Sequence, residues 1–154
     1  MSILETRRLT WPDEAACAAT ARGLAARPAL REAFVELHGP LGAGKTTFVR
    51  HLLHALGVTG RVKSPTYALL EPYDLPGGAV SHFDFYRFDD PQEWEDAGLR
   101  DVFAAPGLKL AEWPEKAAEL LPTADLHLFI EPGEGDLRRV RLDALTPRGV
   151  ELLP

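Results

Sequence analysis

The 154-residue sequence contains a single cysteine, Cys17, so no disulfide can form within the chain. A chain without disulfides is typical of reducing compartments, and we expect a cytoplasmic protein. Cys17 would share one face of a helix with Ala21 and Leu24. We therefore interpret it as a core residue rather than a reactive thiol.

Long apolar segments are also lacking. No stretch approaches the length of a membrane span, and residues 1–8 lack the apolar centre of a signal peptide. We therefore expect no membrane association. Apolar residues make up 45% of the chain and charged residues 26%, which is typical of a globular protein. At this length we expect residues 1–154 to form a single domain.

The third feature that is lacking is excess positive charge. A net charge of −6 argues against a protein that binds nucleic acid through a broad basic surface, and we expect no DNA binding. The densest basic cluster, residues 138–141, fits the solvent face of a strand. Any role in a nucleic-acid process would then depend on a protein partner.

What the sequence does contain is a complete phosphate-binding P-loop. Residues 39–46 read Gly-Pro-Leu-Gly-Ala-Gly-Lys-Thr, after an apolar run at 33–38 and before a helix-forming segment at 45–56. A strand, a glycine-rich turn and a helix in this order form the structural context in which the motif binds a nucleoside triphosphate. The alternative is a chance match in a glycine-rich turn.

Each residue type in the P-loop has a chemical role in binding phosphate. Gly39, Gly42 and Gly44 allow positive φ and turn backbone N–H groups towards a polyphosphate, and the new helix adds its positive end. Lys45 supplies a positive charge for the outer phosphates, and the Thr46 hydroxyl is placed to ligate magnesium.

Periodicity predicts an α/β protein built around this loop. Helices are expected at 10–26, with Thr10 as the cap, at 45–56, and from Asp90 to Gly98. Strands are expected at 33–38, 80–88, 108–113, 126–130, 139–145 and 150–153. Residues 62–73 are expected to be a turn that opens into a strand, which could form a hairpin with 80–88. The alternation predicts a three-layer P-loop NTPase fold with a mixed sheet, a parallel core and antiparallel hairpins.

Two acids are candidates for the chemistry that follows phosphate binding. Asp84 lies in an aromatic segment where alternation places His82 and Tyr86 on its face. Its alternative role is a structural salt bridge with Arg87 or another basic group. Glu112 ends an apolar strand at 108–112 and could hold magnesium, or be an ordinary surface glutamate.

Two further segments allow two interpretations each. Trp113 could pack near a nucleotide or simply belong to the core. Ser64-Pro65-Thr66 could form a loop that senses the γ-phosphate, as switch loops do, or a proline turn that leads into a strand.

Taken in order, four segments closely resemble the TsaE (YjeE-type) family: 39–47, 63–67, 82–87 and 112–115. These are small bacterial P-loop ATPases required for the threonylcarbamoyl modification of the adenosine next to the anticodon of certain tRNAs. The resemblance covers nearly the whole chain, although after about Pro122 only the general pattern matches.

The resemblance implies roles for named residues. ATP would be bound by Gly39, Leu41, Gly42, Ala43, Gly44, Lys45, Thr46 and Thr47. Magnesium would be held by Thr46, Glu112 and Asp84. The catalytic set would be Lys45, Asp84, Glu112 and Thr66, with Thr66 in the switch-like loop. Candidates for further nucleotide contacts are Trp113 and, on the adenine side, Thr10, Trp11 and Arg138.

The resemblance also implies partners. TsaE-type proteins act with a TsaD–TsaB pair, which handles the tRNA, and convert ATP to ADP to reset that assembly. Two other functions remain open: a small-molecule kinase, and an adaptor in which nucleotide binding rather than hydrolysis matters. Because no arginine occupies an evident finger position, we expect slow hydrolysis by the isolated chain.

Overall fold

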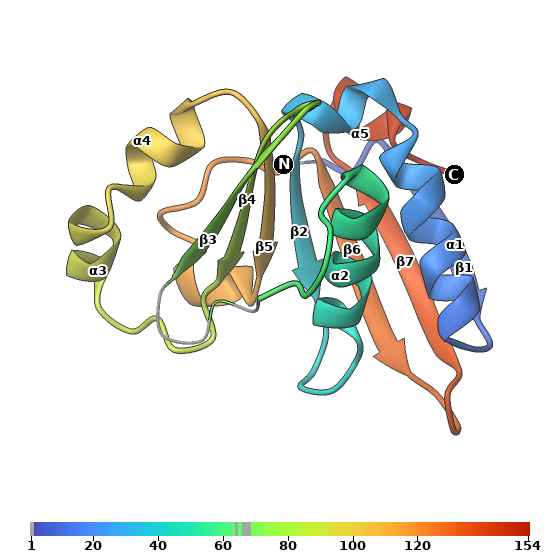
Figure 1. Cartoon of the computed structure of the whole chain (residues 1–154). Helices are drawn as coiled ribbons and strands as arrows, with labels where there is room; N and C mark the ends of the chain where they lie inside the picture. Colours follow the sequence, from blue (N-terminus) through green and yellow to red (C-terminus); the bar gives the residue numbers. More distant parts are fainter. Residues whose placement is uncertain (1, 64, 66–68) are drawn as a thin grey trace.

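The structure, a computed structural model, describes residues 2–63, 65 and 69–154 (Figure 1). A seven-stranded sheet forms its centre, in the order β1-β7-β6-β2-β5-β4-β3. The strands are β1 (Glu5–Trp11), β2 (Phe34–His38), β3 (Leu70–Leu75), β4 (Gly78–Asp84), β5 (Leu108–Glu112), β6 (Leu126–Pro132) and β7 (Arg138–Ala144).

The sheet is mixed in the predicted way. Strands β6, β2, β5 and β4 run parallel, whereas β3 pairs antiparallel with β4, and β7 pairs antiparallel with both β6 and β1. The predicted parallel core and antiparallel hairpins are therefore confirmed. Parallel neighbours end at the same edge of the sheet, so the end of β2 lies beside the end of β5, and the end of β4 follows next along that edge.

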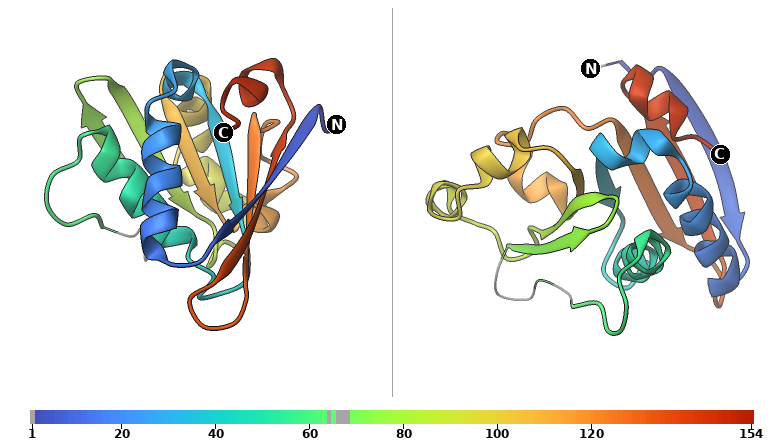
Figure 2. Two further views of the ribbon diagram at one scale, coloured as in Figure 1. Left: turned by 90° about the vertical axis from the view of Figure 1, so that its right-hand side faces the viewer. Right: turned by 45° about the horizontal axis from the view of Figure 1, so that its top comes forward.

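Helices cover both faces, as Figure 2 shows. Among the described residues they are α1 (Glu14–Ala25), α2 (Lys45–Leu56), α3 (Pro91–Asp96), α4 (Leu99–Ala104) and α5 (Pro147–Glu151), with 3-10 turns η1 (Pro28–Glu32) and η2 (Pro114–Ala117). Helices α1 and α2 lie on one side of the sheet, and α3 and α4 lie on the other side, towards β4 and β5 (Figure 2). These are the three predicted layers.

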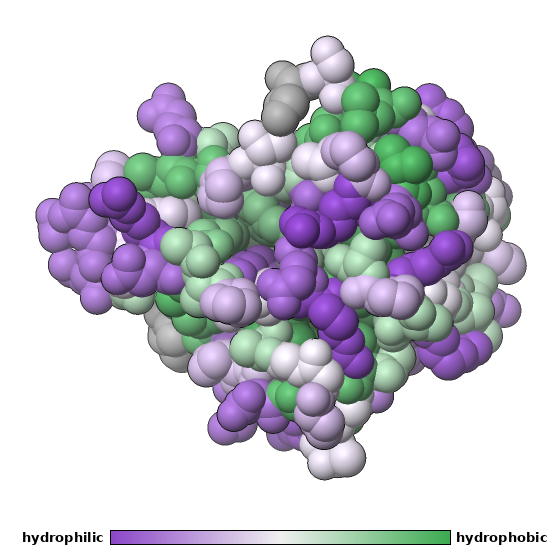
Figure 3. All heavy atoms as spheres, turned by 90° about the horizontal axis from the view of Figure 1, so that it is seen from above, coloured by the Kyte–Doolittle hydropathy of each residue, from purple (hydrophilic) through white to green (hydrophobic). Residues whose placement is uncertain are grey.

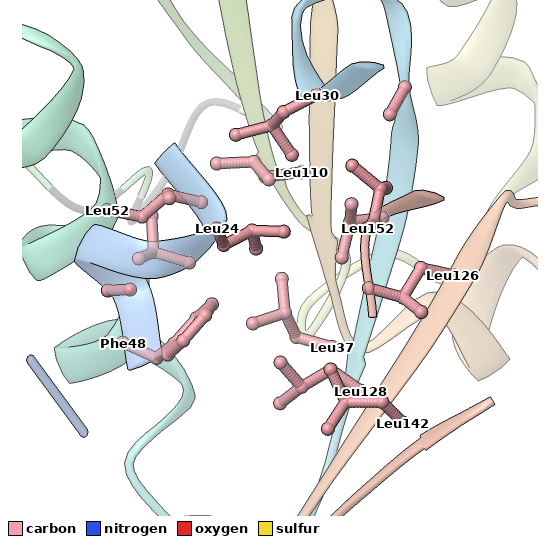
Figure 4. Close-up of a cluster of buried hydrophobic side chains, with 14 of the residues drawn as sticks. Leu24, Leu30, Leu37, Phe48, Leu52, Leu110, Leu126, Leu128, Leu142 and Leu152 are labelled. Carbon is pink, nitrogen blue, oxygen red and sulfur yellow. The ribbon is translucent and has the colours of Figure 1, made fainter. Parts of the chain in front are cut away.

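Alternation along the strands divides the core in two. Val35 and Leu37 of β2 face α1 and α2, where they meet leucines and Phe48 in the larger cluster drawn in Figure 4. Phe34 faces the other way, into an aromatic cluster with Phe83 and Trp94. Cys17 is buried in the larger cluster, as expected, and burial raises the pKa of its thiol to about 11.

The start of the first helix was predicted wrongly. The cap is Asp13, whose carboxylate accepts a hydrogen bond from the Ala16 N–H, and not Thr10. Thr10 and Trp11 instead end β1, where Trp11 pairs with Arg138 of β7. Local sequence could not predict this strand because its partner lies more than a hundred residues away.

Other predicted elements differ from the structure in type or in bounds; the strand expected within 62–73 is β3, Leu70–Leu75. Strand β4 ends at Asp84 rather than Phe88, so Tyr86 lies beyond the strand. The segment 150–153 is not a strand: α5 covers Pro147–Glu151, with Thr146 as its cap. The helix expected from Asp90 to Gly98 is present as α3, but Gly98 also starts the unpredicted α4. A Thr-Pro pair at a cap was the signal for α5 that the strand prediction overlooked.

No helix among the described residues is both long and apolar enough to cross a membrane. On the surface seen in Figure 3, hydrophobic residues form separate patches among hydrophilic ones.

Candidate functional site

The P-loop joins β2 to α2 with the geometry that its glycines predict. Gly39, Gly42 and Gly44 have φ of 150°, 80° and 111°. Gly39 is also constrained by space, because a Cβ there would lie 2.5 Å from the carbonyl oxygen of Ile130 on β6. The P-loop therefore lies against β6, and its last two residues, Lys45 and Thr46, already form the start of α2.

We predict that Gly39→Ala destabilises the fold by about 1–3 kcal/mol, because the new methyl group meets a backbone carbonyl that cannot rotate away. Gly23→Ala in α1 is the control: its Cβ would meet nothing within 4 Å, and it should stabilise the helix by up to about 1 kcal/mol. Urea denaturation measures both changes. If the Gly39→Ala variant were as stable as the wild type, the close approach of residue 39 to the Ile130 carbonyl would be contradicted.

Glu112 is held from two sides at the end of β5. The hydroxyl of Thr46, in the first turn of α2, donates to Oε1 of Glu112 at 2.8 Å. Nε2 of His82, on β4, donates to the other oxygen, Oε2, at 2.6 Å. His82 is fully buried and Glu112 is 2% exposed. This arrangement holds both carboxylate oxygens, with Oε1 directed towards the start of α2 and Oε2 towards His82 on β4.

Asp84 ends β4 directly opposite Glu112 in the parallel register. Its Oδ1 accepts the N–H of Tyr86 at 2.9 Å. Burial raises the pKa of Asp84 above its ordinary value; the Tyr86 N–H opposes this, and the negative charge of Glu112 adds to it. A carboxylate that is half-buried beside another acid suits proton transfer or cation binding better than a surface position would.

Lys45 is the buried cation of the site, with 4% exposure. Its ammonium donates to the Gly39 carbonyl and lies 3.4 Å from the centre of the Trp113 ring. Burial lowers the pKa of Lys45, and Glu112, Glu115 and Asp84 oppose that shift. Trp113 itself has a φ of 55°, a strained backbone for a non-glycine residue, which is typical of functional positions.

Two hollows flank the P-loop and share Ala43, Gly44 and Thr47. The first is completed by Leu41, Gly42, Lys45, Thr46, Asp84, Tyr86, Glu112 and Trp113. The second is completed by Trp11, Asp13, Glu14, Cys17, Asp136 and Arg138. A ligand that crosses the P-loop would therefore contact acids and the lysine on one side, and an aromatic and an arginine on the other.

Of the three adenine-side candidates, Trp11 and Arg138 line the second hollow and Thr10 does not. Trp11 lines the second hollow but is only 3% exposed, because it stacks on Phe48 with ring centres 5.6 Å apart. Nε of Arg138 donates to the Ala43 carbonyl at 2.9 Å, which ties β7 to the P-loop. Thr10 lines neither hollow; it is exposed on the other face of β1, beside Arg8 and Arg139.

Leu41 lines the first hollow but is 73% exposed, at the tip of the P-loop. Thr66 lies outside the described residues, so the predicted sensing role stays a prediction. Conversely, sequence reasoning gave no role to His82. The available signal was its place two residues before Asp84, on the same face of a strand.

The sequence matches a known family. The family model described as threonylcarbamoyl adenosine biosynthesis protein TsaE matches residues 11–140. The chain belongs to the TsaE family. The family's role is in the biosynthesis of threonylcarbamoyladenosine in tRNA. The match spans both hollows, from Trp11 on β1 to the arginine-bearing strand β7.

Individual TsaE relatives agree with this assignment. The tRNA threonylcarbamoyladenosine biosynthesis protein TsaE of Haemophilus influenzae is 44% identical over 119 residues, which cover 77% of this chain and 75% of that protein. The TsaE protein of Bacillus subtilis is 38% identical over 112 residues, covering 73% of this chain and 70% of that protein. The crystal structure of Bacillus subtilis YdiB superposes with a TM-score of 0.79 and 26% identity, over 99% and 94% of the two chains.

Proposed function

We propose that this protein is a magnesium-dependent ATPase that supports threonylcarbamoyladenosine formation on tRNA, together with partners of the TsaD–TsaB type. The observation that carries the proposal is the position of Glu112, with Thr46 on one carboxylate oxygen and His82 on the other, beside the P-loop. Family membership supports the pathway.

The donor set suits magnesium. The Thr46 hydroxyl, the Glu112 carboxylate and, one strand away, the Asp84 carboxylate are oxygen ligands, which magnesium prefers alongside several waters. When bound, the ion would neutralise charge on the outer phosphates of ATP. Thr46 and Glu112 would hold it, directly or through water.

The remaining residues would bind and orient ATP. N–H groups of the P-loop, with its three positive-φ glycines, and the start of α2 would surround the phosphates. Lys45 would move from the Gly39 carbonyl to a phosphate oxygen, which is a stronger acceptor because it is charged. The second hollow, with Trp11 and Arg138, would take the nucleoside.

Asp84 is the residue we assign to the attacking water. Its carboxylate lies in the same hollow as Lys45 and Thr46 but is not held by Thr46 or His82 as Glu112 is. The pKa of Asp84 is raised by burial, which makes its carboxylate a better proton acceptor. It would position the water and accept its proton during hydrolysis.

Hydrolysis by the isolated chain should be slow. Among the described residues that line the phosphate-side hollow there is no arginine to stabilise the transition state. The missing charge would come from a partner. The net charge of −6 agrees with tRNA being bound mainly by those partners.

The test is ATP turnover by the purified chain alone, with a purified TsaD–TsaB pair, and with that pair plus tRNA. We expect low turnover alone, stimulation by the pair, and repeated rounds of tRNA modification only when all components and magnesium are present. Rapid hydrolysis without partners would contradict the requirement for a partner. Transfer of labelled phosphate to a nucleoside or metabolite would indicate a kinase instead.

We predict a positioning role for His82. In His82→Leu, Oε2 of Glu112 loses its donor, and the magnesium concentration needed for half-maximal turnover should rise about 10- to 100-fold, as for other residues that orient a metal ligand. His82→Gln, which retains an N–H donor, should recover part of this. Thermal unfolding of both variants separates the effect from lost stability. An unchanged magnesium dependence in folded His82→Leu would exclude the role.

A further inference from the structure

Two histidines and a glutamate meet on the sheet face opposite α1 and α2. Glu36 and His38 are two residues apart on β2, so both point away from the side on which Val35 and Leu37 pack. In the parallel register, His127 of β6 lies opposite Glu36. Two neighbouring strands, β2 and β6, therefore place three ligand-type side chains at one point of the sheet.

Their donor atoms converge. Nε2 of His38 and Nε2 of His127 each lie 3.1 Å from the same oxygen, Oε1 of Glu36. One donor atom from each residue lies within 4.8 Å of the other two. A tetrahedral zinc ion with bonds of about 2.0–2.2 Å has donors roughly 3.3–3.5 Å apart, so small side-chain movements would admit the ion.

The surroundings orient the imidazoles. The Phe129 ring stacks on His38 with centres 4.6 Å apart and contacts His127 edge-on at 6.0 Å. The guanidinium of Arg141 lies 4.1 Å from the Phe129 ring centre and pairs with Asp143 at 3.3 Å. Arg141 therefore pairs with Phe129 and Asp143, and it lies beside the cluster of Glu36, His38 and His127 rather than within it.

The cluster is accessible to an ion. The Glu36, His38 and His127 side chains are 11%, 20% and 26% exposed. Burial lowers the pKa of His127, which favours the neutral imidazole that metal binding requires. The site differs from the nucleotide site because Glu36 and His38 point to the opposite face of the sheet from α2.

We propose that Glu36, His38 and His127 bind a divalent transition-metal ion of the zinc type through two imidazole nitrogens and one carboxylate. Three protein ligands leave one coordination position for water or for a ligand from outside the chain, whereas closed structural zinc sites use four. Imidazoles favour zinc over magnesium, so this site would not compete for the ion that accompanies ATP. The alternative is a hydrogen-bonded ion-pair cluster with no metal.

In the experiment, the tag-free, metal-stripped protein is titrated with Zn²⁺ in the presence of millimolar Mg²⁺, and isothermal titration calorimetry measures the binding. We expect one Zn²⁺ per chain, and binding at least about 10- to 100-fold weaker in His38→Gln and in His127→Gln. His54→Gln is the matched control, since His54 bonds to the Gly60 carbonyl on the exposed side of α2 and should leave binding unchanged. Co²⁺ gives a second readout, because a tetrahedral site produces intense visible absorption.

Thermal unfolding completes the test. Because an ion that binds only the folded state stabilises it, Zn²⁺ should raise the Tm of the wild type and of His54→Gln, but not of the two cluster variants. Glu36→Gln provides a further folded variant if either histidine variant unfolds. Absence of Zn²⁺ binding by the wild type, or binding that all variants share equally, would overturn the proposal and leave an ion-pair cluster only.

Discussion

Asp84→Asn should lower partner-stimulated ATP turnover by about 100-fold or more while leaving ATP affinity nearly unchanged. The amide oxygen of asparagine can still accept the N–H of Tyr86, so the end of β4 should keep its conformation. An amide cannot accept a proton from water, so the chemical step loses its base. Steady-state turnover and the binding of a fluorescent ATP analogue measure the two effects separately.

Asp74→Asn is the matched control for this substitution. Asp74 is exposed on β3, outside both hollows. Its substitution by asparagine removes the same negative charge as Asp84→Asn does. Normal turnover in Asp84→Asn would remove Asp84 from the mechanism. If Asp84→Asn still binds ATP but loses both ATP turnover and tRNA modification, hydrolysis is required for function. That result would exclude an adaptor that acts through nucleotide binding alone.

Lys45→Ala should weaken binding of ATP about 10- to 100-fold, because charge-assisted hydrogen bonds to phosphate oxygens are worth roughly 1.5–3 kcal/mol. The loss should be larger for ATP than for AMP, since Lys45 is placed for the outer phosphates. It lines the phosphate-side hollow together with Thr46 and Asp84. Calorimetric titration with ATP and with AMP, both in the presence of magnesium, measures this difference.

Lys116→Ala is the control for Lys45→Ala. Lys116 is exposed on η2 and outside the hollows, so its removal changes net charge without touching the loop. Thermal unfolding is needed as well, because Lys45 also contacts the Gly39 carbonyl and the Trp113 ring. Wild-type ATP affinity in a folded Lys45→Ala protein would contradict the phosphate-binding role.

Part of the site could be predicted because its signals are local. The P-loop is a continuous segment whose glycines, lysine and threonine have defined uses, and the structure places it between β2 and α2 as expected. Asp84, within the strand expected at 80–88, and Glu112, at the end of its strand, are both candidate acids in the sequence, and the structure places both at strand ends. That they lie opposite each other depends on β4 and β5 being neighbours.

The errors share a cause. Strand β1 was missed because its partner, β7, lies at the other end of the sequence, and Thr10 alone resembles a helix cap. His82 received no role because a buried histidine in a strand is read as core until its partner is known. That partner, Glu112, is thirty residues away and lies on a different strand.

The sequence by itself determined the α/β class, the P-loop and the two acids, because turn chemistry, hydrophobic period and motif spacing act within short segments. Only the tertiary structure decided the strand order, the two-sided hold on Glu112, the tie from Arg138 to the P-loop, and the meeting of His127 with Glu36 and His38. Each of these contacts joins residues that are distant in the chain. Such contacts follow from which strands become neighbours, and no local pattern specifies that choice.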